Sequence, residues 1–472
     1  MLPVVVISII LVLSFTWFVF RRRSSSATKI PGIAASHPDR GNLDDIGRAG
    51  SLHQFLTQLH HRFGPVASFY WGELYVVSLA SPNAFQDTRR LFDRPVPLFA
   101  AVEPLIGAHS IQYANGDDGR YRRKNHYDVA LSPVALRHHF FDIFLSVLRE
   151  KMLDWRTNDG QQPIGLHAEM FSMAIRSITL AAFGSSSAFR DETRIEHAYH
   201  TCWHEMEMRI QGASVDARRT LEFDQARAYL FEQVKATIAE RRQRSGETDK
   251  CFVDYLLNDE ERVRSDEHIG DEVITMFVGG FHTTGNLLTW TLYYLAKYPH
   301  VQERLADELV RTSTGEFPTF EQIEQMPYLS NVINESLRLS VLAPWAARVS
   351  PDESIAVCGY EIPAGTPIIQ ALGVVMHDET IWTNPKEFNP DRFDPKKRKL
   401  LPAFAFSPFG FAGKRVCPGY RFAQYEASAF LSGIIRAFKV TLEDSLRPIV
   451  PVHGLVTAPN EEIRVRFQAR AT

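Results

Sequence analysis

Apolar residues recur at helical spacing over much of this chain, from about Phe85 to Tyr298. The longest such stretch is predicted between Ser265 and Tyr298. Ser265 can cap its N-terminus, acidic residues follow in the first turn, and Pro299 closes it. This pattern predicts a mainly α protein.

Strand-like sequences lie outside this helical stretch. Residues 65–70 and 74–79 flank Gly72-Glu73 and predict a pair of strands. Shorter strand patterns follow at residues 355–357 and 360–370. We therefore expect small β-sheets in addition to the helices.

The N-terminus has a different character. Leu2 to Phe20 is a run of 19 uncharged residues, followed directly by Arg21-Arg22-Arg23. A helix of that length spans roughly 28 Å, about one hydrocarbon core. Positive charge after the apolar run predicts a retained signal anchor with its basic end in the cytosol, the alternatives being a cleaved signal or a buried helix. The predicted divisions are an anchor (1–20), a basic and polar linker (21–36) and a globular domain (37–472).

Composition narrows the function classes. The 472 residues are 45% hydrophobic, which is ample for a large core, and the net charge is −3. Such a charge does not suggest a nucleic-acid-binding protein. The four cysteines are scattered without a CxxC pair, so no disulfide framework is predicted and the globular part should face the cytosol.

One of these cysteines has an unusual setting. Cys417 lies in the sequence Gly413-Lys414-Arg415-Val416-Cys417-Pro418-Gly419, and helical periodicity begins directly afterwards. Loop amides, the helix dipole and Arg415 would favour a thiolate, and glycines let a flat ligand approach. A thiolate under a large planar group suggests an axial haem ligand. The alternative is a small buried hydrophobe beside turn glycines.

The long predicted helix contains a second unusual sequence, Gly279-Gly280-Phe281-His282-Thr283-Thr284. Each interior glycine costs about 1 kcal/mol relative to alanine, which suggests that another flat body approaches closely. Thr283 could hydrogen-bond a ligand or a backbone carbonyl. His282 could relay protons near neutral pH, or it could be a packed core histidine.

Charged sequences supply further candidates. Residues 120–126 are the densest basic run of the globular part, either a solvated helix face or a site for anions. Glu335 and Arg338 lie one helical turn apart, and Arg392 follows in Pro390-Asp391-Arg392-Phe393.

Four of these motifs occur together in one order, and that order resembles the cytochrome P450 family: Gly279-Gly280-x-x-Thr283, Glu335-x-x-Arg338, Pro390-Asp391-Arg392-Phe393 and Gly413-x-Arg415-x-Cys417-x-Gly419. The resemblance covers nearly all of the chain after the linker. Within the superfamily, residues 50–53, 62–66 and 371–375 are most similar to family 20, a group without a settled substrate. The cysteine loop differs from the family's sequence pattern at one position, where this chain has Gly410 and the family has phenylalanine.

The resemblance implies a site for haem b. Cys417 would be the axial ligand of the iron, in a loop with Gly413, Arg415 and Gly419. Gly280 would lie against the haem. Thr283 would aid proton delivery, with His282 in the place of the family's usual acid.

The same resemblance implies contacts around the haem. Arg348 stands where the family often has a propionate-binding arginine. In the basic run, Tyr121 and Asn125 occupy the family's tryptophan and arginine positions, so the propionate contact is expected to pass to Arg122 or Lys124. Glu335, Arg338 and Arg392 would form a buried structural network behind the haem loop, in which losing one partner leaves a charge unpaired.

The function implied is a haem-thiolate monooxygenase anchored in the endoplasmic reticulum membrane. It would oxidise a lipophilic small molecule with electrons from NADPH–cytochrome P450 reductase, and cytochrome b5 is a second candidate donor. A reductase-independent isomerase, dehydratase or peroxygenase is an alternative, because the usual acid before Thr283 is missing. A haem sensor without turnover is another.

Overall fold

The computed structural model of the chain describes residues 29–470, apart from residues 159, 186–190, 211, 212, 214, 215, 244–249, 260, 263 and 314. The predicted anchor and the first half of the predicted linker lie outside these residues. Within the described ranges, no helix is both long enough and apolar enough to cross a membrane.

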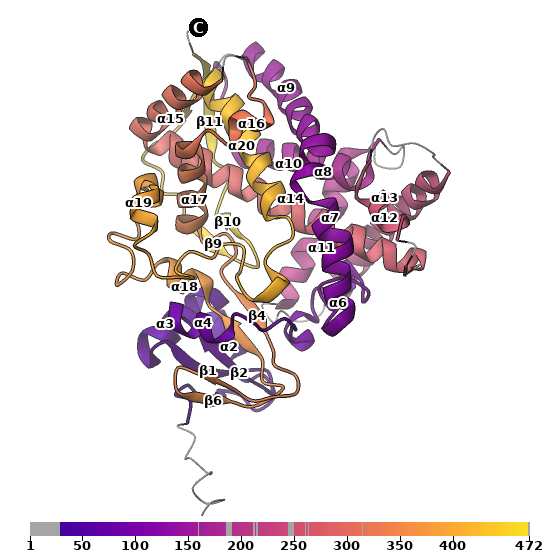
Figure 1. Cartoon of the computed structure of the whole chain (residues 1–472), viewed down its shortest axis with the longest axis vertical. Coiled ribbons are helices and arrows are strands. Elements are labelled where there is room, and N and C mark those ends of the chain that lie inside the picture. The colour runs from indigo at the N-terminus through magenta and orange to yellow at the C-terminus, as the bar shows by residue number, and fades with distance from the viewer. Residues whose placement is uncertain are drawn as a thin grey trace, which may run out of the picture.

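The described chain is mainly helical, which confirms the prediction (Figure 1). The α-helices are α2 (Leu43–Ala49), α3 (Leu52–Phe63), α4 (Pro82–Thr88), α5 (Glu103–Ile106), α6 (Gly116–Arg122), α7 (Asp128–Ala130), α8 (Pro133–Ala135), α9 (Phe141–Asn158), α10 (Leu166–Phe183), α11 (Glu192–Ile210), α12 (Ala217–Arg242), α13 (Phe252–Leu257), α14 (Asp266–Lys297), α15 (Pro299–Thr312), α16 (Phe320–Ile323), α17 (Pro327–Ser340), α18 (Leu372–Met376), α19 (Pro395–Arg398) and α20 (Tyr420–Ala437). The 3-10 turns are η1 (Val96–Phe99), η5 (Pro390–Phe393) and η6 (Gly413–Arg415), and the π-helical turns are η2 (Arg123–Tyr127) and η3 (Leu136–Phe140).

The strands form four small sheets. Their bounds are β1 (Val66–Trp71), β2 (Leu74–Leu79), β3 (Ile164–Gly165), β4 (Ala346–Arg348), β5 (Ile355–Val357), β6 (Tyr360–Ile362), β7 (Ile368–Gln370), β8 (Phe438–Leu442), β9 (Pro451–His453), β10 (Thr457–Pro459) and β11 (Arg464–Ala469). The largest sheet has the order β1-β2-β7-β4, and β2 pairs in parallel with β7 from the far end of the chain. The predicted β1–β2 hairpin is confirmed. The C-terminal strands β8 to β11 were not predicted.

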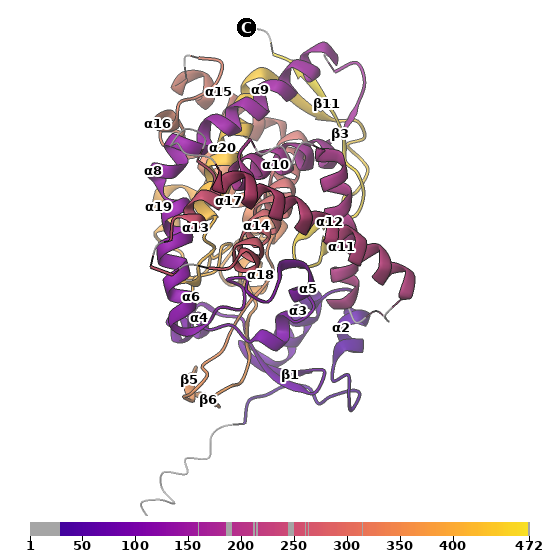
Figure 2. The same ribbon diagram turned by 90° about the vertical axis from the view of Figure 1, so that its right-hand side faces the viewer.

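The described residues form two large hydrophobic cores and one small cluster of Trp382, Phe393 and Ala405. The smaller of the two large cores joins the β1-β2-β7-β4 sheet to α2, α3, α4 and α18, at the lower end of Figure 1. The larger one lies among the long helices above it, and Figure 2 shows α14 running through their middle.

Helix α14 forms as the sequence predicted. The Ser265 side chain accepts a hydrogen bond from the His268 backbone, Asp266 and Glu267 occupy the first turn, and Pro299 begins the next helix. Most of α14 is buried against α10, α12, α17 and α20. The helix is therefore a fixed central element on which a site can be built.

Candidate active site

The Cys417 loop runs from η6 into the start of α20, as predicted. The Cys417 backbone N–H donates to the Phe409 carbonyl at 2.9 Å, which closes the loop on itself. Gly410 has φ +74°, in the left-handed region that a side chain disfavours. Glycine at position 410 therefore suits the backbone conformation that this loop adopts.

The electrostatic surroundings of Cys417 differ from the prediction in one respect. Burial raises the pKa of the Cys417 thiol, while a hydrogen bond from the Gly419 backbone and the charges of Arg123 and Arg94 oppose that rise. The charges that oppose the rise are thus those of Arg123 and Arg94, which the sequence motif did not include. A thiol that coordinates a metal ion loses its proton, and two nearby guanidinium groups help to stabilise the resulting anion.

Arg415 instead holds the loop to a neighbouring segment. Its buried guanidinium donates to the carbonyls of Phe92 (3.2 Å) and Ile111 (2.8 Å), and also to that of Ala114. The segment 109–115, which accepts the bonds at Ile111 and Ala114, also touches α14, because the Thr275 hydroxyl lies 2.7 Å from Ser110 Oγ. The segment therefore links the Cys417 loop to the central helix.

Four arginines gather around Cys417, and we call them the arginine cluster: Arg94, Arg123, Arg348 and Arg415. Burial, with repulsion from Arg94, lowers the pKa of Arg348 to about 9 and that of Arg415 to about 8. Arginine keeps its charge in proteins. The repulsion among these four cations is therefore reduced by nearby anions rather than by loss of a proton. Arg348 Nε is buried and has no hydrogen-bond partner among the residues described.

The predicted contacts in the basic run shift by one residue. Arg122 is buried in ion pairs with Glu272, at 3.0 Å, and with Asp118, and Lys124 is exposed. Neither joins the arginine cluster, and the charge of Arg122 is already paired with two carboxylates. Arg123, between them, donates to the Val416 carbonyl in the Cys417 loop.

Arg123 is the first residue of the π-helical turn η2, directly after the end of α6 at Arg122. Arg123 lies within the basic run, which is a signal for it in the sequence. Arg94 lies in a loop that contains no recognised motif, so no signal in the sequence points to it.

Helix α14 has one open face. Between Ile269 and Leu295 it is buried except at Thr275, Gly279, Gly280 and Thr283. Three of these four are spaced by four residues and share a face. The Thr283 hydroxyl donates to the Gly279 carbonyl at 2.7 Å, so its oxygen lone pairs remain to accept a hydrogen bond.

The two glycines of this sequence have different roles. A Cβ atom on Gly279 would meet nothing within 4 Å, so Gly279 borders open space. A Cβ atom on Gly280 would collide with the side chain of Ile178 in α10. Gly280 therefore allows α10 to pack closely, and Gly279 is the glycine that borders open space.

His282 lies off this face, in an aromatic cluster between α10, α11 and α14. Its ring stacks on Trp203, with centroids 4.1 Å apart, and meets Phe171 edge-on at 5.2 Å. Burial and the neighbouring His200 and His167 lower the pKa of His282 well below 6.5. These contacts fit the packed core histidine rather than the predicted proton relay.

We therefore predict that His282→Phe reduces the acid sensitivity of the fold. A histidine whose pKa is lowered by folding costs stability as the pH falls below its unfolded value near 6.5, because the unfolded chain then binds more protons. Between pH 7.5 and 5.5 the unaltered protein should lose about 1.4 kcal/mol more unfolding free energy than the variant. Urea titrations at the two pH values measure this, and equal losses would mean that His282 becomes protonated within the fold.

The three residues of the predicted structural network, Glu335, Arg338 and Arg392, come together in one group of ion pairs. Arg338 Nε and Nη2 lie 2.7 and 2.8 Å from the Glu335 carboxylate, and Arg392 Nε lies 3.1 Å from it. Glu335 and Arg338 are fully buried. Arg392 also donates to the Asn384 carbonyl, which ties the 384–392 segment to α17.

The residues present fit a haem. Cys417 offers a sulfur ligand, the arginine cluster offers cations for two carboxylates, and Gly279 leaves a side-chain-free surface for a flat ring. No group of three or more histidine, cysteine or acidic side chains in the described parts of the chain is arranged to hold a bare metal ion.

Comparison with known proteins also indicates a haem-binding protein. The family model for cytochrome P450 matches residues 31–467, so the chain belongs to the cytochrome P450 family and is a monooxygenase of that family. It is 30% identical to mouse cytochrome P450 20A1 over 455 residues, which cover 95% of this chain and 94% of the relative. Bovine cytochrome P450 20A1 is equally similar over 454 residues. Mouse mitochondrial sterol 26-hydroxylase is 30% identical over 224 residues, covering 46% of this chain and 42% of the hydroxylase.

Proposed function

We propose that this chain is a membrane-anchored haem-thiolate monooxygenase that takes electrons from NADPH through a reductase and oxidises a lipophilic small molecule. The observation that carries the proposal is the arginine cluster around Cys417: four cations and one thiol in a mostly buried site. Such a site is unfavourable by itself and becomes favourable when a dianionic, iron-containing ring enters it.

The chain's own residues would bind and orient the haem. Cys417 would ligate the iron, Arg94, Arg123 and Arg348 would neutralise the propionates, and Arg415 would keep the loop attached to segment 109–115. When bound, the haem supplies the iron that activates dioxygen, and the thiolate donates electron density to favour O–O cleavage. The buried Arg348 Nε is a donor ready for a propionate oxygen.

The open face of α14 would form the opposite wall. Gly279 lets a flat ring or a substrate approach the backbone closely. Thr283, whose proton is held by the Gly279 carbonyl, can accept a hydrogen bond from a water molecule and orient it. His282 is neutral and turned into the core, so protons would reach that water along the open face and not through the imidazole.

A basic hollow on the surface supports electron transfer from an acidic partner protein. Five exposed cations line this hollow of about 730 Å³: Arg89, Arg90, Arg120, Lys124 and Lys414. The ring of Phe92 joins the hollow to the site, because the Arg120 guanidinium lies 4.6 Å from it and the Arg415 guanidinium 4.3 Å. We propose that the NADPH-dependent reductase docks here and that cytochrome b5 is a second candidate.

Charge reversal in the basic hollow should weaken the reductase interaction. We expect Lys124→Glu to raise the reductase concentration needed for half-maximal NADPH oxidation about tenfold at low salt, because charged surfaces steer association. The effect should fade at high salt, where screening shortens electrostatic range. Lys235→Glu on α12 carries the same charge change away from the hollow and should have little effect. Equal effects of the two variants would contradict this docking surface.

The membrane anchor is a separate proposal that rests on the uncharged run at residues 2–20 and the arginines after it. We expect deletion of residues 2–20 to move the protein from carbonate-resistant membranes toward the soluble fraction. Fractionation with carbonate measures this, and a mature protein whose N-terminus begins after Phe20 would contradict a retained anchor. The endoplasmic reticulum is the proposed location, with the globular domain in the cytosol.

Reconstitution with purified reductase tests the proposed activity. The haem-loaded protein should show a thiolate-type CO spectrum and consume NADPH only with reductase and a lipophilic compound present. Turnover driven by peroxide alone would favour a peroxygenase, and stable haem binding without turnover under either condition would favour a sensor.

A further inference from the structure

Glu272 lies in α14, two helical turns before Gly279, and its side chain is fully buried. The carboxylate accepts three hydrogen bonds from separate segments: from Arg122 Nη1 at 3.0 Å, from the Tyr127 hydroxyl at 2.5 Å and from the Ile111 backbone N–H at 3.3 Å. Burial and the Glu272 carboxylate raise the pKa of Tyr127 well above 10, so the hydroxyl remains a donor. One carboxylate therefore fastens three segments to the central helix.

One route from Glu272 to the Cys417 loop passes through Ile111. The Ile111 N–H donates to Glu272, and the Ile111 carbonyl accepts a hydrogen bond of 2.8 Å from Arg415, two residues before Cys417. Both hydrogen bonds are buried, so water does not compete for them. The position of Arg415 is therefore tied to α14 through a single residue.

A second route passes through Arg122 and Arg123. The Arg122 guanidinium pairs with Glu272 at 3.0 Å. The next residue, Arg123, donates to the carbonyl of Val416, directly before Cys417. The two routes thus end at the two residues that precede Cys417.

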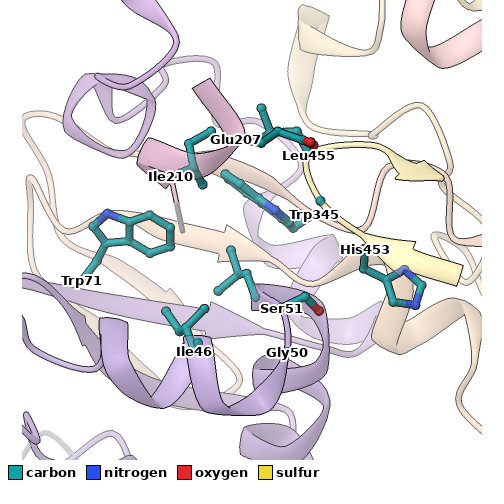
Figure 3. Close-up of a pocket in the computed structure, with 12 residues that line it drawn as sticks. Ile46, Gly50, Ser51, Trp71, Glu207, Ile210, Trp345, His453 and Leu455 are labelled. Carbon is teal, nitrogen blue, oxygen red and sulfur yellow. The ribbon is translucent and has the colours of Figure 1, made fainter. Parts of the chain in front are cut away.

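Other enclosed carboxylates of the described chain have different surroundings. Glu308 accepts from the backbone N–H groups of Tyr328 and Leu329, and so holds the first turn of α17. Glu207 lies at a cavity of about 150 Å³ between α2, α11 and the β9–β10 turn (Figure 3). Glu272 differs from both, because its partners lead to the Cys417 loop.

We propose that Glu272 is a positioning residue for Cys417 and sets the separation between the Cys417 loop and the open face of α14. Helix α14 carries both the anchor of the loop, at Glu272, and the opposite wall of the proposed haem site, at Gly279. One rigid helix therefore fixes the width of that site. The inference rests on the proposed haem-thiolate function and adds a residue that belongs to none of the sequence motifs.

Glu272→Gln tests this role, because glutamine keeps the shape and an acceptor oxygen but removes the charge. The variant should fold, since Arg122 keeps its ion pair with Asp118. In the haem-loaded full chain we expect the backbone amides of residues 409–419 to exchange with deuterium about tenfold faster, because the loop opens more often. The thiolate-type CO spectrum should also decay about tenfold faster. Mass spectrometry and absorbance measure the two effects.

Glu308→Gln is the matched control, since it changes another buried carboxylate that accepts backbone hydrogen bonds. It should lower the urea midpoint of unfolding and leave both rates within about twofold of the unaltered protein. Tyr127→Phe removes one donor from Glu272 and keeps the ring. It should accelerate both rates about threefold, and it decides the test if Glu272→Gln does not retain haem.

Three results would be informative in different ways. Equal exchange rates of residues 409–419 in Glu272→Gln and Glu308→Gln would overturn the proposal. Faster exchange with an unchanged CO spectrum would also overturn it, because the loop would then open without affecting the ligand. The absence of a thiolate-type spectrum from the unaltered protein would reject the proposed function instead, and the exchange rates would still decide whether Glu272 holds the loop.

Discussion

Substituting serine for Cys417 should abolish the thiolate-type CO spectrum entirely, the largest spectroscopic effect expected of any single change. A serine hydroxyl is not appreciably acidic near pH 7, so it cannot replace the thiolate as a soft, anionic ligand. The variant also leaves the charges of Arg123 and Arg94 without the anion beside them. We expect a haem content below that of the unaltered protein and no thiolate signature in what remains.

The other cysteines provide the controls. Cys202 and Cys251 are buried, and burial raises the pKa of each thiol to about 12, so neither is suited to be a thiolate. Cys358 is exposed in the turn between β5 and β6. Cys358→Ser and Cys251→Ala should keep the spectrum. A thiolate-type spectrum from the Cys417 variant would reject the ligand assignment and, with it, the proposed function.

Local sequence features were sufficient for the elements that frame the site. Capping residues and periodicity predicted α14, glycine spacing predicted the Cys417 loop before α20, and a turn dipeptide predicted the β1–β2 hairpin. Each of these depends on residues within a few positions of one another. The short strands β8 to β11 were missed for two reasons. The hairpin strands β9 and β10 have only three residues each, and β8 pairs with β11 across the whole of that hairpin, so neither pair leaves a clear pattern in the chain.

The direction of individual side chains was harder to predict. Gly279 and Gly280 are adjacent, yet only the position of Ile178 on another helix determines which of them faces open space. Arg123 was not singled out within the basic run, and its bond to the Val416 carbonyl, far along the chain, is what places it at the Cys417 loop. His282 looked suited to carry protons until its contact with Trp203 placed it in the core. In each case the deciding contact comes from a distant part of the chain that no motif encodes.

The buried network around Glu335 leads to the second large effect. In Glu335→Ala, Arg338 would keep its charge in a site where its side chain has no solvent exposure, and Arg392 would lose the same partner. Breaking a buried ion pair in this way costs about 3–5 kcal/mol. The network also fastens α17 to the segment that leads toward the Cys417 loop, because Arg338 donates to the Met376 carbonyl and Glu335 accepts from the Asn389 backbone. We therefore expect the variant to fail to retain haem rather than to turn over slowly.

An exposed ion pair in the same turn separates this effect from a general loss of charge. Asp391 stands next to Arg392 in η5 and pairs with Arg304, but both side chains are about half exposed. Asp391→Ala should cost at most about 1 kcal/mol and leave haem binding intact, because water solvates the released charge. Haem content per polypeptide and the midpoint of urea unfolding, measured for both variants, provide the comparison. A Glu335→Ala protein as haem-loaded and as stable as Asp391→Ala would show that water or a rearranged carbonyl satisfies Arg338, and the network would then be dispensable for the site.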